Sequence, residues 1–473
     1  MASKERFFAD LSTEINSVTG SKHLAVVRLP NGERIKFLVD CGQFLGEDDK
    51  YNYLPFTFDS EDLSFVLITH SHIDHIGMLP LLVKKGYRGK IYTSEDTKVL
   101  LPYALEDTCK VLGENAKRNR RPKFYTDTDV ETTISHVCDC PMNVPIYTSP
   151  YTKVFFFKNA HLVGATMILV IISYPGYEDI NLLFMGDYNN KNVFLDSEEL
   201  PDWVKELRLT VIAEATYGCM VSSEVTTCFG ENICRAARDG KIIHIPVLAV
   251  GRTQEALYFI RNLQKDRFLS TDVSIFYDGK LGMKNTKLFT NGSLHIKESM
   301  RDFLPQNLTW VDKTIRQALI EDNGCKIILS TSGMGSYGPS RMYIPAFVER
   351  PNALIHFTCY TTPTSLGGKL KQAGQNEKVE IAGMVVRKKA EVKYTTEFSS
   401  HSKADVEMEF LKKFKRLQCV LVTHGENESK EMFASRILDN VHTKNVCIFD
   451  RRNYFRIGPY GLIKTLPSKF PIL

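Results

Sequence analysis

The chain has 473 residues, of which 43% are hydrophobic and 24% charged, and its formal net charge is +5. This composition is that of an ordinary globular protein and excludes a disordered or membrane-embedded one. The mild positive charge is compatible with a polyanionic partner but does not require one. At this length we expect two domains, because a single hydrophobic core stops growing at about 250–300 residues.

The N-terminus has no apolar core of signal-peptide length, and no stretch approaches the roughly 18 apolar residues of a membrane helix. We therefore expect an intracellular, cytoplasmic protein that does not enter a membrane. Eleven cysteines at irregular spacing indicate reduced thiols rather than a disulfide framework. Cys138 and Cys140 are the one close pair; a metal role for them with His136 is an alternative that we do not favour, because no second pair exists.

The first part of the chain is rich in predicted strands. Residues 24–29 and 35–40 form a predicted β-hairpin around a turn at Pro30-Asn31-Gly32. Helical composition is confined to about residues 95–116, and the further predicted strands are residues 63–69, 89–93, 153–157, 167–172 and 181–185. Many strands with few helices predict stacked sheets flanked by helices.

After about residue 205 the pattern changes to alternating strands and helices. A predicted helix at 253–265 follows a strand at 241–247, and further strands are predicted at 272–277, 326–329 and 353–357. This alternation is typical of βαβ units around a parallel sheet, and hence of a second domain. A helix at 403–414, a strand at 419–423 and a helix at 428–440 end the predicted elements.

Four strong metal-ligand side chains fall within six residues of the run His70-Ser71-His72-Ile73-Asp74-His75. Imidazole nitrogens and a carboxylate are donors that suit Zn²⁺ and similar ions. An apolar strand precedes the run and helical spacing follows it, so the run occupies a strand-to-helix turn. At such a turn His70 and His72 can reach one metal ion while Asp74 and His75 reach a second.

Two ions need more donors than this run contains. Other candidates follow predicted strands in the same way: His161, Asp187 and His424, with a carboxylate at Asp187 placed to bridge both ions. Asp40 also ends a strand. Each residue alone would more often be an ordinary buried or surface residue, and their shared position just past a strand is what favours ligation.

This set of residues resembles that of the metallo-β-lactamase superfamily, and the second half of the chain is similar to its β-CASP branch of RNA-processing nucleases. The similar motifs are Asp40, His70-x-His72-x-Asp74-His75, His161, Asp187, Glu214-Ala215-Thr216-Tyr217-Gly218, Gly251-Arg252-Thr253-Gln254-Glu255, Gly333-Met334-Gly335, Phe398-Ser399-Ser400-His401 and Thr423-His424-Gly425-Glu426. The resemblance implies an α/β fold, a metallo-β-lactamase αββα sandwich with an inserted β-CASP α/β domain. We expect domain segments at residues 1–205, 206–394 and 395–473, the inserted domain being the middle one.

The resemblance also implies roles for particular residues. Two Zn²⁺ ions are expected, one held by His70, His72 and His161 and the other by Asp74, His75 and His424, with Asp187 bridging. Asp74, Asp40, Glu214 and His401 are the expected catalytic set; Asp40 would orient a ligand, and His401 paired with Glu214 would donate a proton to the leaving oxygen. The expected substrate-binding residues are Arg252, Gly333, Met334, Gly335, Ser336, Ser399, Ser400 and Arg341.

The function implied is hydrolysis of RNA phosphodiester bonds in a cleft between the two domains, because members of the branch that act on RNA usually carry a histidine where this chain has His424. An RNA-processing complex or a homo-oligomer is compatible with the sequence, and a nuclear location would apply to a eukaryotic processing factor. Two alternatives remain: a hydrolase of small molecules on the same fold, and a non-catalytic subunit of an RNA-processing complex. Residues 333–338 also match the dinucleotide-binding pattern G-x-G-x-x-G, but no suitably placed acidic residue accompanies them.

One basic run has no place in these motifs. Residues 117–123 carry five basic side chains in seven positions. Most such runs are solvated loops, but with an RNA substrate they become a candidate contact to phosphates.

Overall fold

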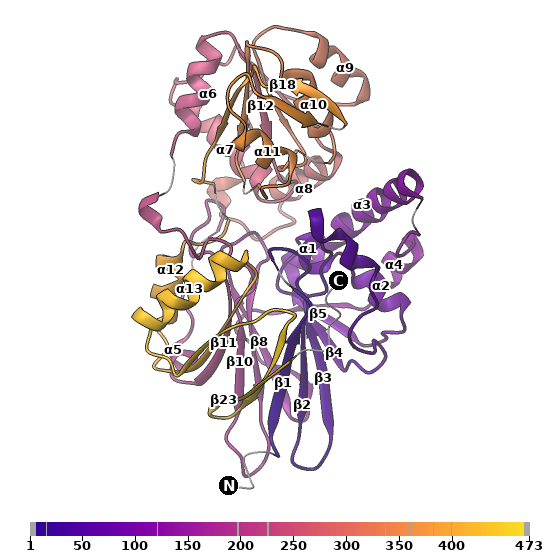
Figure 1. Cartoon of the computed structure of the whole chain (residues 1–473), viewed down its shortest axis with the longest axis vertical. Coiled ribbons are helices and arrows are strands. Elements are labelled where there is room, and N and C mark those ends of the chain that lie inside the picture. Colours follow the sequence, from indigo (N-terminus) through magenta and orange to yellow (C-terminus); the bar gives the residue numbers. More distant parts are fainter. Residues whose placement is uncertain are drawn as a thin grey trace. The chain divides into compact units, whose positions relative to one another are not determined.

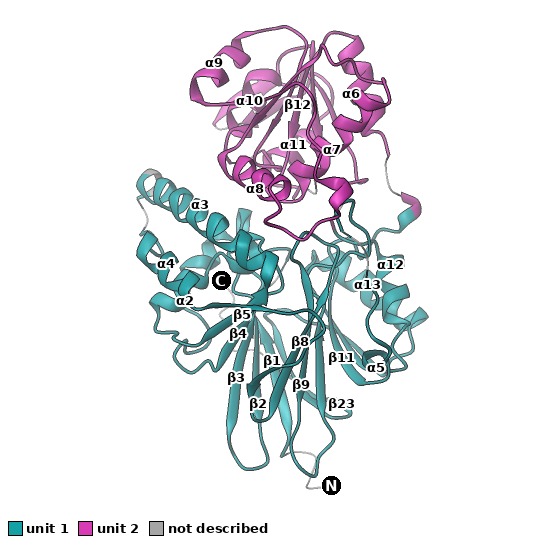
Figure 2. Cartoon of the chain, turned by 180° about the vertical axis from the view of Figure 1, so that it is seen from behind, with its two compact units in different colours: residues 1–222, 401–473 teal, residues 223–400 magenta. Residues whose placement is uncertain are grey.

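A computed structural model describes residues 6–15, 17–120, 122–195, 198–224, 227–335, 337–359, 361–381, 383–398 and 400–467, without the side chains of 118 and 119. It divides the chain into two compact units, each described by itself. Unit 1 comprises Met1–Ser222 and His401–Leu473, and unit 2 comprises Ser223–Ser400 (Figure 2). The boundaries that the sequence suggests, at 205/206 and 394/395, stay a prediction.

Unit 1 contains two mixed β-sheets. The first has the order β23-β22-β1-β2-β3-β4-β5-β6, with bounds Gly461–Pro467, Asn453–Gly458, Phe8–Thr13, His23–Arg28, Arg34–Val39, Phe65–Leu67, Lys90–Ser94 and Val137–Cys140. The second has the order β21-β20-β11-β10-β9-β8-β7, with bounds Asn445–Ile448, Arg416–Thr423, Arg208–Glu214, Ile180–Phe184, Thr166–Ile172, Thr152–Lys158 and Ile146–Ser149. Each sheet therefore combines strands that precede unit 2 in the chain with strands that follow it.

The two sheets face each other across a common core. Phe37 and Leu67 of the first sheet share one buried cluster with Phe156, Phe184 and Leu421 of the second. Helices cover the two outer faces (Figure 1): α1 (Ile73–Ile76), α2 (Leu79–Lys84), α3 (Glu95–Asn119) and α4 (Asp127–Ser135) on the first sheet, and α5 (Asp202–Lys205), α12 (Ala404–Leu411) and α13 (Asn427–Asn440) on the second. The αββα sandwich expected from the sequence is confirmed.

The pattern of burial along each inner strand shows which of its two faces is packed. In β2 buried residues alternate with half-buried or exposed ones, whereas all seven residues of β9 are buried because β9 lies between β10 and β8 with side chains packed on both faces. β8 and β10 are both antiparallel to β9, and β10, β11 and β20 are parallel to one another. The carboxyl ends of β8, β10, β11 and β20 consequently lie at one edge of the second sheet.

Unit 2 is built around a six-stranded sheet whose registers are all parallel, as the alternation of strands and helices predicts. Its order is β14-β13-β15-β12-β16-β19, with bounds Leu308–Trp310, Ser274–Asp278, Lys326–Ser330, Ile242–Pro246, Ala353–Phe357 and Glu391–Tyr394. A two-stranded sheet joins β17 (Lys378–Ile381) to β18 (Met384–Arg387). The α-helices of this unit are α6 (Phe229–Arg238), α7 (Arg252–Lys265), α8 (Lys280–Thr290), α9 (Lys313–Glu321), α10 (Ser340–Phe347) and α11 (Leu366–Gln372).

Candidate metal centre

The loop between β4 and α1 carries the histidine-rich run, and backbone hydrogen bonds hold it on two sides. The N–H groups of Ser21, Cys41 and Gln43 donate to the carbonyl oxygens of Asp74, His75 and Ile73 over 2.7 to 3.0 Å. Gly42 lies in the same contact: a Cβ atom at this position would lie 1.5 Å from the carbonyl oxygen of Asp74. Because only a glycine permits this approach, Gly42 sets how closely the loop packs on its neighbours.

Three more polar side chains reach this loop from the edge of the second sheet. His161, Asp187 and His424 closely follow the strands β8, β10 and β20, and Glu214 ends β11 at the same edge. All seven predicted ligands gather in two donor sets: His70, His72, His161 and Asp187 in the first, and Asp74, His75, Asp187 and His424 in the second. The structure therefore brings together residues separated by more than 300 positions in the chain.

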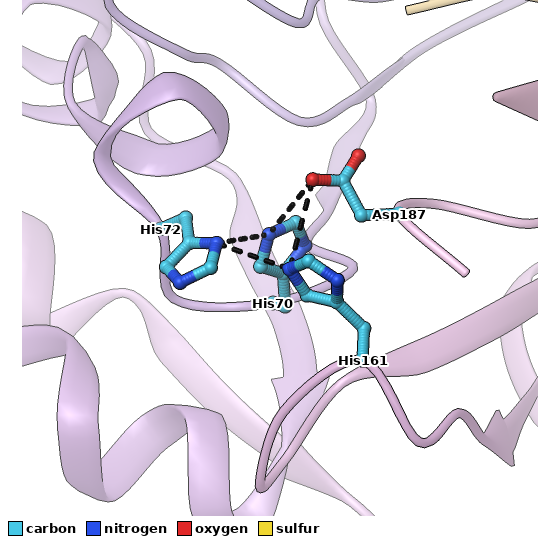
Figure 3. Close-up of side chains that lie close together, drawn as sticks. All are labelled: His70, His72, His161 and Asp187. Carbon is cyan, nitrogen blue, oxygen red and sulfur yellow. Dashed lines mark hydrogen bonds and ion pairs between the residues drawn. The ribbon is translucent and has the colours of Figure 1, made fainter. Parts of the chain in front are cut away.

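The first donor set surrounds a small space (Figure 3). His72 Nδ1 lies 3.2 Å from His70 Nε2 and 3.1 Å from His161 Nε2. Asp187 Oδ2 lies 3.7 Å from the Nε2 atom of each of these last two histidines. His72 thus presents Nδ1 to the set, whereas His70 and His161 present Nε2.

The second donor set uses the other oxygen of Asp187. Asp187 Oδ1 lies 3.3 Å from His75 Nε2 and 3.4 Å from His424 Nε2. Asp74 Oδ2 lies 3.8 Å and 3.6 Å from the same two nitrogen atoms. Because each carboxylate oxygen of Asp187 faces a different set, this residue is placed to bridge two ions.

Both sets fit a metal ion by the spacing of their atoms, and the second set does so also by its unsatisfied hydrogen-bonding capacity. Four ligands at 2.0–2.1 Å around a tetrahedral zinc ion lie about 3.3–3.4 Å from one another, and the separations above are 3.1 to 3.8 Å. Among the described residues, the buried atoms His72 Nε2, His75 Nε2, Asp187 Oδ1 and His424 Nε2 have no hydrogen-bond partner. Buried polar atoms are rarely left unsatisfied, so three of these four, as donors of the second set, indicate a site for a divalent cation.

The protonation of His70 and His72 is consistent with ligation. Burial and the neighbouring His75 lower the pKa of His70 well below its ordinary value, and burial lowers the pKa of His72 to about 4. Both rings are therefore neutral at pH 7, the form that binds a metal. Burial also acts to lower the pKa of His75, but the carboxylates of Asp187 and Asp40 outweigh it and raise this pKa well above the ordinary value.

Asp40 lies behind the second set rather than in it. Its Oδ2 atom lies 2.7 Å from His75 Nδ1, and its two oxygens accept hydrogen bonds from Thr69 N and Thr69 Oγ1 at 2.8 Å each. A carboxylate in this position orients the ring and fixes which nitrogen faces the metal. Thr69 Oγ1 also lies 3.0 Å from His70 Nδ1, and Thr216 Oγ1 lies 3.1 Å from His424 Nδ1. Sequence reasoning did not single out either threonine, although Thr69 directly precedes the histidine-rich run and Thr216 is within the motif that begins at Glu214.

His401 and Glu214 form a pair beside the bridging aspartate. His401 Nδ1 lies 2.6 Å from Glu214 Oε1, and His401 Nε2 lies 3.8 Å from Asp187 Oδ2. Backbone N–H groups of Tyr188 and Thr216 donate to the two oxygens of Glu214, at 2.9 and 3.0 Å. Burial acts to lower the pKa of His401, but the Glu214 and Asp187 carboxylates outweigh it, and the net effect is a raised pKa.

The predicted substrate-binding residues belong to unit 2. Arg252 is 4% exposed, its guanidinium donates to the carboxylate of Glu255, and it lies 5.7 Å from the centre of the Phe398 ring. Gly333 and Gly335 are buried in the β15–α10 loop with Met334 half-buried; Arg341 on α10 is exposed and Ser400 is half-buried. Ser336 and Ser399 lie outside the described residues.

Three further features of the sequence can be compared with the structure. In the basic run, Lys117 and Arg120 are exposed at the end of α3, and Arg121 lies outside the described residues. Within the described part, Cys138 and Cys140 on β6 do not enter a group of potential metal ligands, and His136 Nδ1 lies 2.8 Å from the carbonyl oxygen of Gly89. No helix among the described residues is long and apolar enough to cross a membrane.

Three family models match the chain in succession. The model of the metallo-beta-lactamase superfamily matches residues 24–134, which include the histidine-rich run, and that of the Beta-Casp domain matches residues 253–370. The model of the Zn-dependent metallo-hydrolase RNA specificity domain matches residues 385–447, which include His401 and His424.

Similar proteins come from all three domains of life. A ribonuclease of Thermus thermophilus is 29% identical over 424 residues, 87% of this chain and 91% of that protein. The transcription termination factor FttA of Methanosarcina mazei is 27% identical over 428 residues, 85% of this chain but only 65% of that protein. The cleavage and polyadenylation specificity factor subunit 3-II of Arabidopsis thaliana is 27% identical, covering 87% of this chain and 67% of that protein. Together with the fold and the donor sets, these matches show that the chain belongs to the metallo-β-lactamase superfamily, in the branch that carries a β-CASP domain.

Proposed function

We propose that this protein is a zinc-dependent ribonuclease that hydrolyses RNA phosphodiester bonds with two metal ions and a histidine general acid. The observation that carries the proposal is the position of Asp187, which faces both donor sets and also lies 3.8 Å from His401. Two adjacent ions with a proton donor beside them are what hydrolysis of a phosphodiester needs, because charge develops on the phosphate oxygens and on the leaving oxygen.

Each donor set would hold one ion. His70, His72 and His161 would bind the first and Asp74, His75 and His424 the second, with Asp187 shared. When bound, two Zn²⁺ ions supply a water of lowered pKa and neutralise charge on the phosphate. Asp40 holds the His75 ring so that Nε2 faces the second set, because its carboxylate lies against the opposite nitrogen, 2.7 Å away.

His401 would protonate the leaving 3′-oxygen of the cleaved nucleotide. Its Nδ1 atom lies against Glu214 and its Nε2 atom points toward Asp187, so the nitrogen that can donate faces the metal sets. The carboxylate of Glu214 favours the protonated ring and raises its pKa, which increases the fraction of the acid that carries its proton. Two backbone N–H donors fix Glu214 in turn, so the pair is held in one orientation.

Three observations support RNA as the substrate. The RNA specificity model covers the segment that contains His401 and His424, one similar protein is named a ribonuclease, and another a cleavage and polyadenylation factor subunit. Arg252, Gly333, Met334, Gly335, Ser400 and Arg341 remain our candidates for contacts to RNA. The amides of the glycine-containing loop and the exposed Arg341 are groups that bind phosphate.

The test is to incubate the purified protein with zinc and with end-labelled linear or circular RNA. We expect cleavage of RNA that a chelator abolishes and zinc restores, with the Asp187→Asn variant as the inactive control. Cleavage of circles shows endonuclease action, whereas cleavage of linear RNA alone from its 5′ end shows exonuclease action. Activity on small esters without activity on RNA would favour the small-molecule hydrolase, and metal binding without any hydrolysis would favour a non-catalytic subunit.

A further inference from the structure

Asn159 is a buried polar residue that the proposed mechanism does not use. It directly follows β8, precedes His161 by two positions, and has an exposed fraction of 4%. Burying an amide is unfavourable unless its donors and acceptors are satisfied, so its partners explain why it is there.

The Asn159 side chain makes four hydrogen bonds, all to backbone. Its Nδ2 group donates to the carbonyl oxygens of Met185, at 3.0 Å, and Asp187, at 2.6 Å. Its Oδ1 atom accepts from the N–H groups of His161 and Asn189, each at 3.0 Å. An asparagine amide has two N–H donors and one carbonyl oxygen with two lone pairs, so these bonds use its whole capacity. The partners also determine which end of the amide carries the nitrogen, because carbonyl oxygens face one side and N–H groups the other.

Two of these partners are the backbone groups of proposed metal ligands. The bond to the His161 N–H holds the loop after β8, and the bond to the Asp187 carbonyl holds the loop after β10. One backbone bond, from Ala160 N to the Asn189 carbonyl oxygen at 3.0 Å, joins the same two loops. The ligand atoms themselves, His161 Nε2 and Asp187 Oδ2, lie 3.7 Å apart.

We propose that Asn159 is a positioning residue for the metal centre, which holds the loop of His161 and the loop of the bridging Asp187 at the separation that a shared ion needs. The inference rests on the proposed centre but concerns metal affinity rather than cleavage. Residues that orient metal ligands are typically worth 10- to 100-fold in metal affinity or activity. Because Asp187 serves both donor sets, loss of Asn159 weakens the binding of both ions.

The surroundings of Asn159 decide which substitutions test this. Besides these hydrogen bonds, Asn159 lines an open pocket of about 220 Å³, together with Tyr188 and Asn189 among other residues. Water from this pocket can replace part of the amide in Asn159→Ala. Asn159→Asp keeps the shape but turns a carboxylate oxygen toward two carbonyl oxygens, so it is the more disruptive change to the loops. Asn181 provides a matched control, because it is also a buried asparagine whose Nδ2 donates to a backbone carbonyl oxygen, that of Arg208, at 3.1 Å. It lies near the N-terminal end of β10, whereas Asp187 follows the C-terminal end.

The experiment measures zinc affinity by competition with a chromogenic chelator, and ligand geometry by the visible absorption of the cobalt-substituted protein. We expect metal dissociation constants raised roughly 10- to 100-fold in Asn159→Asp, a smaller rise in Asn159→Ala, altered cobalt bands in both, and an unchanged circular dichroism spectrum. Asn181→Ala should bind zinc as the wild type does.

Unchanged affinity and cobalt spectra in both Asn159 variants would overturn the inference, as would an equal loss of affinity in Asn181→Ala. A wild-type protein that binds zinc tightly but does not cleave RNA would contradict the proposed function alone and leave the role of Asn159 standing. If Asn159→Asp does not fold, the alanine variant decides the question. Alanine is smaller than asparagine and uncharged, so it introduces neither a new charge nor a steric clash.

Discussion

Replacement of His401 by alanine should slow RNA cleavage without removing the metal ions. His401 Nε2 lies 3.8 Å from Asp187 Oδ2. His401 is absent from both four-membered donor sets and enters only a third group, with Asp187 and Glu214, so we expect its loss to leave both four-membered sets complete. A positioned general acid contributes 10²–10⁴-fold, and at 1.36 kcal/mol per factor of ten its loss raises the barrier by about 2.7–5.4 kcal/mol. The upper part of this range is expected, because the ring is only 17% exposed and Glu214 lies within hydrogen-bonding distance of it.

The assay compares two substrates with different leaving groups. RNA loses a 3′-alkoxide, which needs a proton, whereas bis(4-nitrophenyl) phosphate loses 4-nitrophenolate, which leaves without one. We expect His401→Ala to lose most of its kcat on RNA and little on the aryl ester, with zinc content unchanged. Equal losses on both substrates would refute the assignment and favour a contact between His401 and the phosphate; full activity on RNA would exclude both roles.

Three further perturbations act on the same centre. Asp187→Asn removes the one carboxylate that both donor sets share, so we expect zinc content measured by mass spectrometry to fall at both sites and cleavage to stop. Glu214→Gln removes the negative charge that raises the pKa of His401; since the acid must be protonated, the alkaline limb of the kcat–pH profile should move to lower pH. Gly42→Ala forces a Cβ to within 1.5 Å of the carbonyl oxygen of Asp74, so the loop must move and zinc affinity should fall by more than about 10-fold.

For the first two of these substitutions, a particular result would contradict the expectation. Two tightly bound zinc ions in Asp187→Asn would exclude a bridging carboxylate, and an alkaline limb that did not move in Glu214→Gln would separate this residue from the general acid. Gly113→Ala is the control for Gly42, because Gly113 is in the interior of α3 and the described atoms nearest to a Cβ there belong to the Lys123 side chain, at 3.8 Å or more. That change should stabilise the helix by about 1 kcal/mol and leave zinc affinity alone.

Most of the central elements could be predicted from local sequence. The run at 167–172 is apolar at every position because β9 is buried on both faces, and the predicted helix at 253–265 matches α7 to within one residue. The strands at the sheet edges were not foreseen. β22 and β23 lie beside β1, so the C-terminal segment completes the first sheet, and β23 is largely exposed, which leaves its hydrophobic alternation weak.

The candidate ligands could be proposed from sequence because metal chemistry restricts their residue types and because side chains just past parallel strands share an edge. That reasoning identified His161, Asp187 and His424 as candidates, and the structure places them in the donor sets. The predicted contacts in unit 2 are of a different kind: Arg252 pairs with Glu255, three positions further along α7. That spacing favours an ion pair on a helix, whereas the burial of Arg252 comes from the tertiary structure.

The sequence by itself determined the residue types, their order along the chain and the strands that they follow. Only the tertiary structure decided that one oxygen of Asp187 faces each donor set, that His72 presents Nδ1, and that Asn159 joins two ligand loops. The physical reason is one of scale. A strand-end motif places a side chain to within several ångströms, whereas metal ligation depends on differences of a few tenths of an ångström between distant loops, which only sheet register and the packing of the two layers set.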